Sequence, residues 1–253
     1  MSARVVLLAK VPRPGRVKTR LCPPCTPEQA ARVAAAALSD TVAAVNASRA
    51  ALRVLLTDVP CAAPAGWSAG LQRGGPLSER LTHAFTGAEA PDPRGVLAEA
   101  AVAGRGGVFA AGSGGPAPAT TLLIGMDTPQ LTGGHLDEAL RLLSEADAVL
   151  GEAEDGGWWG LGLNDPGHAE VLRDIPTSTA TTGAQTREAL LRRGLRVAEL
   201  PRLRDVDTAP DAFAVAALCP PGRRFPRAVA AEIPSAAEVP SVAGIPSVAG
   251  MVR

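Results

Sequence analysis

The hydrophobic and polar positions of this chain form two kinds of segment that alternate along most of its length. Short apolar runs are typical of strands buried on both faces, and they occupy residues 3–9, 51–57, 120–124, 147–151 and 195–200. Apolar residues three and four positions apart predict amphipathic helices at residues 26–46, 77–85, 133–146, 182–193 and 212–218. Strands that alternate with helices predict a doubly wound α/β fold.

Composition divides the chain into one expected domain, residues 1–218, and two segments of low complexity. Residues 87–119 are rich in glycine, proline and alanine, which predicts a flexible insertion within that domain. From residue 219 on, the chain is rich in proline and alanine and ends in a near repeat. We therefore expect residues 219–253 to be a disordered tail.

The overall composition excludes several classes of protein. Hydrophobic residues make up 46% of the 253 positions and the formal net charge is zero, so we expect a globular chain without nucleic acid or membrane partners. No apolar run is long enough to cross a membrane, and the start of the chain lacks the apolar core of a signal peptide, which favours a cytoplasmic protein. Cys22 and Cys25 have redox or half-zinc spacing, but without a second close pair they are interpreted as incidental loop cysteines. The oligomeric state is left open.

Residues 120–129 contain the first candidate functional residue. A buried strand ends here, Pro129 prevents its continuation, and Asp127 stands between the two. A carboxylate at the carboxyl end of a buried strand lies where open α/β sheets bind their ligands. Asp127 is therefore a candidate ligand of a divalent metal that holds a nucleotide diphosphate. The alternative is an aspartate that only caps the following turn.

A basic loop follows the first predicted strand. Residues 10–20 contain five basic residues, two prolines and Gly15, and no acidic residue. Lysine supplies a point charge, arginine a planar fork and glycine a close backbone approach, so the loop suits a pyrophosphate group. It has neither a Walker A spacing nor the three glycines of a dinucleotide-binding fingerprint. The alternative is a basic loop that is merely solvated.

Residues 152–163 combine acidic residues, paired glycines and paired tryptophans. Asp155 can hold a hydroxyl or a metal, and Gly156 and Gly157 can admit a close ligand. A tryptophan face can stack on a sugar. The alternative is a β-turn with a packed tryptophan, because Asp-Gly is also a hairpin signal.

Asp205 and Asp207 form a further acidic segment. Two carboxylates two positions apart in an extended chain point the same way. They can reach a metal together with Asp127 only if the fold brings the two segments side by side.

Five motifs carry a resemblance, in this order: Lys10-x-Pro-x-Pro-Gly-x-Val-Lys-Thr-Arg-Leu21, Leu77-Ser-Glu-Arg-Leu-x-x-Ala-Phe85, Ile124-Gly-x-Asp-x-Pro-x-Leu131, Asp155-Gly-Gly157 and Asp205-Val-Asp-Thr208. Over residues 3–218 the chain resembles a bacterial family of predicted glycosyltransferases in the nucleotide-diphospho-sugar transferase superfamily, of the type linked to arsenosugar biosynthesis. The resemblance implies a GT-A fold, with three αβα layers around a mixed, mostly parallel sheet. It also implies a nucleotide at the strand ends and Mg²⁺ or Mn²⁺ on its diphosphate.

The resemblance further implies roles for individual residues. The phosphates would be lined by Lys10, Gly15, Lys18 and Arg20, and the metal would be held by Asp127 and Asp207. The donor sugar or acceptor would be faced by Asp155, Gly156 and Gly157, with Asp155 as the candidate catalytic residue. The chain departs from the family pattern at residues 75–80, 158–162 and 177–179. These departures bear on the identity of the acceptor more than on the fold.

The sequence thus predicts a metal-dependent transferase that moves a sugar from a nucleoside diphosphate sugar to a small acceptor. One alternative is a nucleotidyltransferase of the guanylyltransferase type on the same fold, which releases pyrophosphate from a nucleoside triphosphate. The other is a non-catalytic nucleotide-sugar-binding protein. The presence of Asp127, Asp155 and Asp207 together argues against a mere scaffold.

Overall fold

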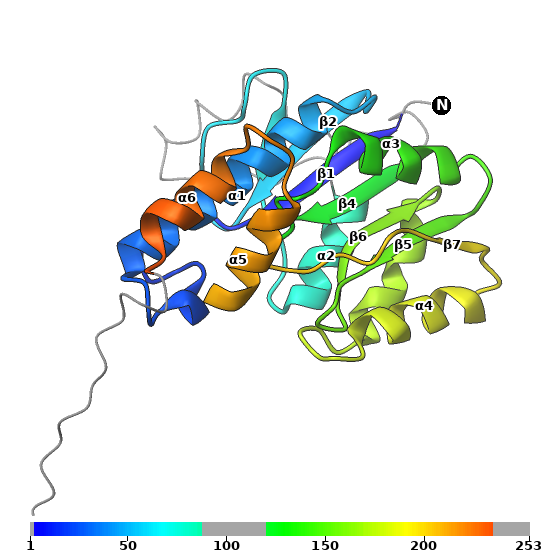
Figure 1. Ribbon diagram of the computed structural model, residues 1–253. Helices are drawn as coiled ribbons and strands as arrows, with labels where there is room; N and C mark the ends of the chain where they lie inside the picture. Colours follow the sequence, from blue (N-terminus) through cyan, green and yellow to red (C-terminus); the bar gives the residue numbers. More distant parts are fainter. Residues whose placement is uncertain (1–2, 88–119, 235–253) are drawn as a thin grey trace, which may run out of the picture.

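The computed structural model describes residues 3–87 and 120–234, and within these ranges seven strands form one sheet (Figure 1). The strands are β1 (Arg4–Ala9), β2 (Leu52–Thr57), β3 (Ser68–Leu71), β4 (Thr121–Gly125), β5 (Ala148–Glu152), β6 (Trp158–Leu163) and β7 (Val197–Glu199). Their spatial order is β3-β2-β1-β4-β6-β5-β7. Strand β6 is antiparallel to both neighbours and the other pairs are parallel, which confirms the predicted mixed, mostly parallel sheet.

Helices cover both faces of this sheet, so the chain has the predicted three αβα layers (Figure 1). One face is covered by α1 (Pro27–Asn46) and α3 (Gly133–Leu142), and α6 (Arg224–Glu232) packs against α1 and α5 (Ala209–Leu218). The other face is covered by α2 (Leu77–Thr86), α4 (Thr182–Arg192) and the 3-10 helix η3 (Pro166–Asp174). None of the helices that the structure describes is long and apolar enough to span a membrane.

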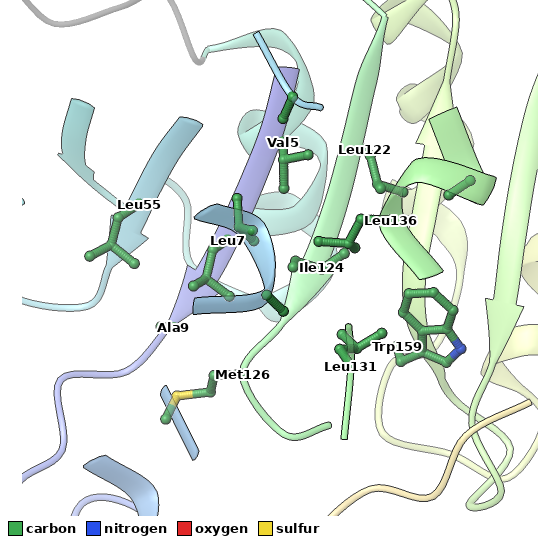
Figure 2. Close-up of a cluster of buried hydrophobic side chains, with 14 of the residues drawn as sticks. Val5, Leu7, Ala9, Leu55, Leu122, Ile124, Met126, Leu131, Leu136 and Trp159 are labelled. Carbon is green, nitrogen blue, oxygen red and sulfur yellow. The ribbon is translucent and has the colours of Figure 1, made fainter. Parts of the chain in front are cut away.

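Strand β4 shows why consecutive apolar residues occupy the middle of a central strand. Leu122 and Ile124 pack into the core beneath α1 and α3, where Figure 2 shows them beside Leu136. Leu123 packs into the core on the opposite face, beneath α2 and η3. Successive side chains of a strand point to opposite faces, so a strand covered on both sides favours apolar residues at consecutive positions.

Strand β6 corrects the sequence interpretation, because residues 158–163 were expected to belong to a loop. Four of its six residues are bulky and apolar, but Gly160 and Gly162 weaken the sequence signal for a strand. The structure explains Gly162: a Cβ atom there would lie 2.6 Å from a methyl group of Val149. Strand β3 and helix η3 were also not predicted, and α3 ends at Leu142, four residues earlier than expected.

Helix α6 corrects the expectation that everything after residue 218 is a disordered tail. Asp40 of α1 accepts hydrogen bonds from the backbone amides of Arg224 and Phe225 at 3.0 and 2.7 Å, which satisfies the first turn of α6. Phe225 and Val229 then pack into a cluster with α1 and α5. Of the insertion predicted at residues 87–119, residues 88–119 lie outside the described residues, and so do residues 235–253 at the end of the chain.

Candidate functional site

The predicted site residues follow strands β1 and β4, which lie side by side and parallel in the sheet. From β1 the chain continues to β2 on one side, whereas the strands that follow β4 lie on its other side. Open α/β sheets bind ligands at the carboxyl ends of the strands where the strand order reverses in this way. Lys10 directly follows β1, and Asp127 lies two residues after β4, so both candidates stand at this point.

The basic loop after β1 has a fixed path. The backbone amide of Val11 donates to the Asp58 carboxylate at 2.8 Å, and the amide of Lys10 contacts the sulfur of Met126 at 3.3 Å. Gly15 and Lys18 both adopt left-handed backbone conformations, with φ of 70° and 47°. Glycine adopts this conformation without cost, and a Cβ at Gly15 would meet no atom within 4 Å. The loop therefore keeps open space at Gly15 while it turns Lys18 inward.

Two basic residues of this loop pair with the two predicted metal ligands. The Lys18 ammonium contacts the Asp127 carboxylate and donates to the carbonyl of Val206. Arg20 donates to the Asp207 carboxylate at 2.7 Å. The Lys18 side chain is only 7% exposed, whereas that of Asp127 is 48% exposed and remains accessible from solvent.

The fold brings the segment 205–207 beside the end of β4, as a shared metal site requires. The amide of Val206 donates to the Asp127 carbonyl at 2.9 Å, and the side-chain amide of Gln130 donates to the Arg204 carbonyl at 2.7 Å. Asp127 and Asp207 therefore flank the same short backbone contact. The two segments therefore lie side by side, which is the condition that the sequence analysis set for Asp205 and Asp207 to reach a metal together with Asp127.

Asp205 is a further carboxylate of the site. The sequence analysis considered it together with Asp207 but assigned it no role in the site. The pKa of its carboxyl is raised to about 7, mainly by burial and then by the negative charges of Asp155, Asp127 and Asp207, against the lowering effect of Lys18. Its Oδ1 atom is buried without a hydrogen-bond partner in the described part of the chain. These influences show that the four carboxylates lie within electrostatic range of one another.

The Asp155-Gly-Gly loop closes the hairpin between β5 and β6. The Asp155 carboxylate accepts from the Gly157 amide at 2.8 Å, which is a local turn contact. Gly156 has φ of 90°, and a Cβ there would lie 2.0 Å from the carbonyl oxygen of Ala180. Close packing against residue 180 therefore accounts for the glycine at 156 without a ligand.

Trp159 belongs to the core and not to an open surface. It is 2% exposed, and its indole NH donates to the carbonyl of Pro201 at 2.9 Å (Figure 2). A Cβ at Gly151 would lie 2.3 Å from the indole ring, so the ring packs directly on that glycine. The alternative of a hairpin with a packed tryptophan describes Trp159 correctly, and stacking of this ring on a sugar is excluded.

Two hollows lie on the β5 and β7 side of the Asp155 loop. One of about 250 Å³ is lined by Asp155, Gly156 and Ala180 among others. The second, of about 640 Å³, lies between α4 and the end of β7 and shares Glu152, Ala184 and Arg202 with the first. Neither is lined by Lys18 or Asp127, so the paired charges and the hollows are neighbouring but separate features of the same sheet edge.

The side chains of Asp127, Asp205 and Asp207 offer carboxylate oxygens, which are the type of donor atom that a hard divalent cation binds. Magnesium and manganese prefer carboxylate oxygens, and the buried Oδ1 of Asp205 still lacks a partner among the described residues. Within residues 3–87 and 120–234, however, no group of three or more His, Cys, Asp or Glu is arranged to hold a metal ion by itself. A metal here would need further oxygen ligands from a bound molecule.

A family model matches residues 29–179, which is more than half of the chain. It describes the family as "Uncharacterized protein conserved in bacteria (DUF2064)". The chain belongs to this family. No curated protein matches it.

Solved structures place this DUF2064 protein in a fold class. A protein from Desulfovibrio desulfuricans G20, proposed to be a nucleotide-diphospho-sugar transferase, is 23% identical, with 92% of this chain and 99% of that chain covered and a TM-score of 0.68. A CMP:2-keto-3-deoxy-manno-octonic acid synthetase solved with CTP is 12% identical over 86% and 98% of the chains, with a TM-score of 0.48. Rv0371c from Mycobacterium tuberculosis H37Rv, solved with manganese, is 16% identical over 85% and 98%, with a TM-score of 0.45. The first likeness confirms the predicted fold, and the other two are too distant to carry an argument.

Proposed function

We propose that this DUF2064 protein is a metal-dependent transferase that moves a sugar from a nucleoside diphosphate sugar to a small acceptor. One observation carries the proposal: Lys18 and Arg20 meet Asp127 and Asp207 at the point where the strand order of the sheet reverses. Basic groups suit a diphosphate and carboxylates suit a divalent cation, so the two kinds of group together suit a metal–diphosphate pair. The solved relative supports only the fold, because its identity is low.

In this proposal Lys10, Lys18 and Arg20 bind the diphosphate, and Gly15 lets it approach the backbone. Asp127 and Asp207, with Asp205 beside them, would hold Mg²⁺ or Mn²⁺. The cation supplies positive charge that stabilises the leaving diphosphate. The basic side chains add preorganised charge at the same place, and this kind of stabilisation is usually the largest contribution to catalysis.

Asp155 is proposed to face the sugar or the acceptor and to be the candidate base. It is exposed, and it borders the hollow of about 250 Å³ that continues toward α4. One of its carboxylate oxygens is engaged by the Gly157 amide, which fixes the orientation of the side chain. The narrower resemblance, to the type linked to arsenosugar biosynthesis, stays a prediction.

A thermal-shift screen with nucleoside diphosphate sugars and nucleoside triphosphates, each with and without Mn²⁺, tests this function. A ligand that binds the native state raises the melting temperature. We expect a Mn²⁺-dependent rise with one diphosphate sugar, followed by release of the nucleoside diphosphate in the presence of an acceptor. A rise with a triphosphate alone, together with pyrophosphate release, would replace the proposal with a nucleotidyltransferase. Binding without turnover across a broad acceptor panel would favour a non-catalytic protein.

Asp127→Asn supplies the matched test of the site. It should remove the Mn²⁺-dependent part of the thermal shift and lower the transfer rate about a hundredfold or more, as expected for loss of one preorganised charge partner. Asp174→Asn replaces an exposed carboxylate at the end of η3 and is the control. It should change neither the Mn²⁺-dependent thermal shift nor the transfer rate. Unchanged turnover of Asp127→Asn would remove this residue from the metal site.

A further inference from the structure

The two candidate metal ligands already have cationic partners within the chain. Lys18 pairs with Asp127, and Arg20 pairs with Asp207. Two positive charges from the basic loop thus face two negative charges from two other loops. The pairing neutralises the charge that would attract a divalent cation to these carboxylates.

The two pairs differ in their surroundings. Lys18 is 7% exposed, and its ammonium is also held by the carbonyl of Val206, so it is poorly screened by water. Arg20 is 73% exposed, and its contact with Asp207 is a surface pair. Surface pairs contribute little to stability, so Arg20 can exchange Asp207 for another anion at small cost.

A diphosphate would compete for the same two basic residues. Arginine and lysine bind phosphate oxygens strongly, and Lys18 and Arg20 belong to the loop that is proposed to bind them. Each basic group that turns toward a phosphate leaves its carboxylate free. Asp205 already stands beside these carboxylates with one unpartnered oxygen in the described part of the chain.

We propose that Lys18 and Arg20 couple the two ligands, so that the divalent cation binds weakly until a nucleoside diphosphate group draws the basic side chains away from Asp127 and Asp207. This inference rests on the proposed function and adds to it a rule for the binding of its metal. Because coupling between two binding sites is reciprocal, the cation also strengthens binding of the diphosphate by the same factor. The two basic residues therefore bind the diphosphate directly and control metal binding through Asp127 and Asp207.

The step on which the coupling depends, suppression of metal binding by the basic residues, can be measured without any nucleotide. The probe is Mn²⁺ alone, titrated into the full-length protein while free Mn²⁺ is followed by electron paramagnetic resonance. Arg20→Gln removes one cation near the carboxylates and leaves the buried parts of the fold untouched. A charge removed about 5 Å from a divalent cation changes its binding by on the order of tenfold in a water-like dielectric. We therefore expect Mn²⁺ to bind Arg20→Gln about ten times more tightly than the original protein.

Arg16→Gln is the matched control, because Arg16 is an exposed residue of the same loop without an ion pair to any described carboxylate. It changes the net charge equally and should alter Mn²⁺ affinity less than twofold. Lys18→Gln should also bind Mn²⁺ more tightly, but its buried amine holds two loops together, so its melting temperature is measured alongside. Arg20→Gln carries the test if Lys18→Gln fails to fold.

Equal Mn²⁺ affinity of Arg20→Gln, Arg16→Gln and the original protein would overturn the coupling while leaving metal-dependent sugar transfer intact. Absence of Mn²⁺ binding to all three proteins at millimolar concentration would also overturn it. Tighter binding by Arg20→Gln in a protein that transfers no sugar would support the coupling and reject the proposed function. The two proposals therefore fail on different observations.

Discussion

The backbone amide of Val206 donates a 2.9 Å hydrogen bond to the backbone carbonyl of Asp127. This contact joins the segment before α5 to the end of β4, although the two are far apart in the sequence. Asp205 and Asp207 stand on either side of Val206, so one backbone hydrogen bond brings both carboxylates to Asp127. The candidate site thus depends on a main-chain contact in which no functional side chain takes part.

Replacement of Gly156 by alanine should destabilise the chain strongly. The residue has φ of 90°, and its new Cβ would lie 2.0 Å from the carbonyl oxygen of Ala180, so the loop or the start of α4 must move. A left-handed alanine costs about 1 kcal/mol and overpacking adds further strain, so we expect a loss of about 3 kcal/mol in the free energy of unfolding. Denaturation by urea, monitored by circular dichroism, measures the loss.

Gly194→Ala is the matched control for this prediction. Gly194 has a similar φ of 78°, but a Cβ there meets no atom within 4 Å. Its replacement should cost only the backbone strain, about 1 kcal/mol. Equal losses for the two variants would show that the contact with Ala180 does not constrain the Asp155 loop.

Replacement of Asp40 by alanine should loosen α6. Asp40 is 3% exposed and accepts from two backbone amides at the start of that helix, so alanine leaves both donors without their acceptor. We expect a loss of about 2–4 kcal/mol in the free energy of unfolding. Asp40→Asn keeps one acceptor oxygen and should lose less. In Asp40→Ala, hydrogen exchange should become faster in α6 while it stays slow in β4. Unchanged exchange in α6 would contradict the role of Asp40 in holding the start of that helix.

The raised pKa of Asp205 predicts a particular pH dependence of stability. Its folded carboxyl titrates near pH 7, whereas an unfolded aspartate titrates near 4, so between these values the folded chain binds more protons. Stability contributed by this group is therefore full below pH 4 and is lost as the pH rises through 7. The loss is on the order of 4 kcal/mol at most, since each pKa unit corresponds to about 1.4 kcal/mol.

Asp205→Asn tests this dependence with metal removed by a chelator. The amide does not titrate, so the fall in stability of the original protein between pH 4 and pH 7 should become shallower in the variant. At pH 8 the variant should be the more stable of the two. A variant whose stability follows the same pH curve as the original protein would show that Asp205 titrates normally.

Much of the fold could be predicted from the sequence, because periodicity is a local property. Strands β1, β2, β4 and β5 and helices α1, α2 and α4 lie where the apolar pattern placed them. Strand β6 was missed because Gly160 and Gly162 weaken the strand pattern, and the reason for Gly162 is visible only in its contact with Val149. Helix α6 was missed because its first turn is satisfied by Asp40, a residue 184 positions away from Arg224.

The sequence by itself determined the strand–helix alternation, the basic loop after β1 and the carboxylate after β4, since each depends on residues adjacent in the chain. Only the tertiary structure decided that Arg20 pairs with Asp207 across 187 positions, that Asp205 lies partly buried near like charges and that Trp159 fills the core. Hydrogen bonds, desolvation and Coulomb interactions depend on distance in space, and the chain order of distant segments does not contain that distance.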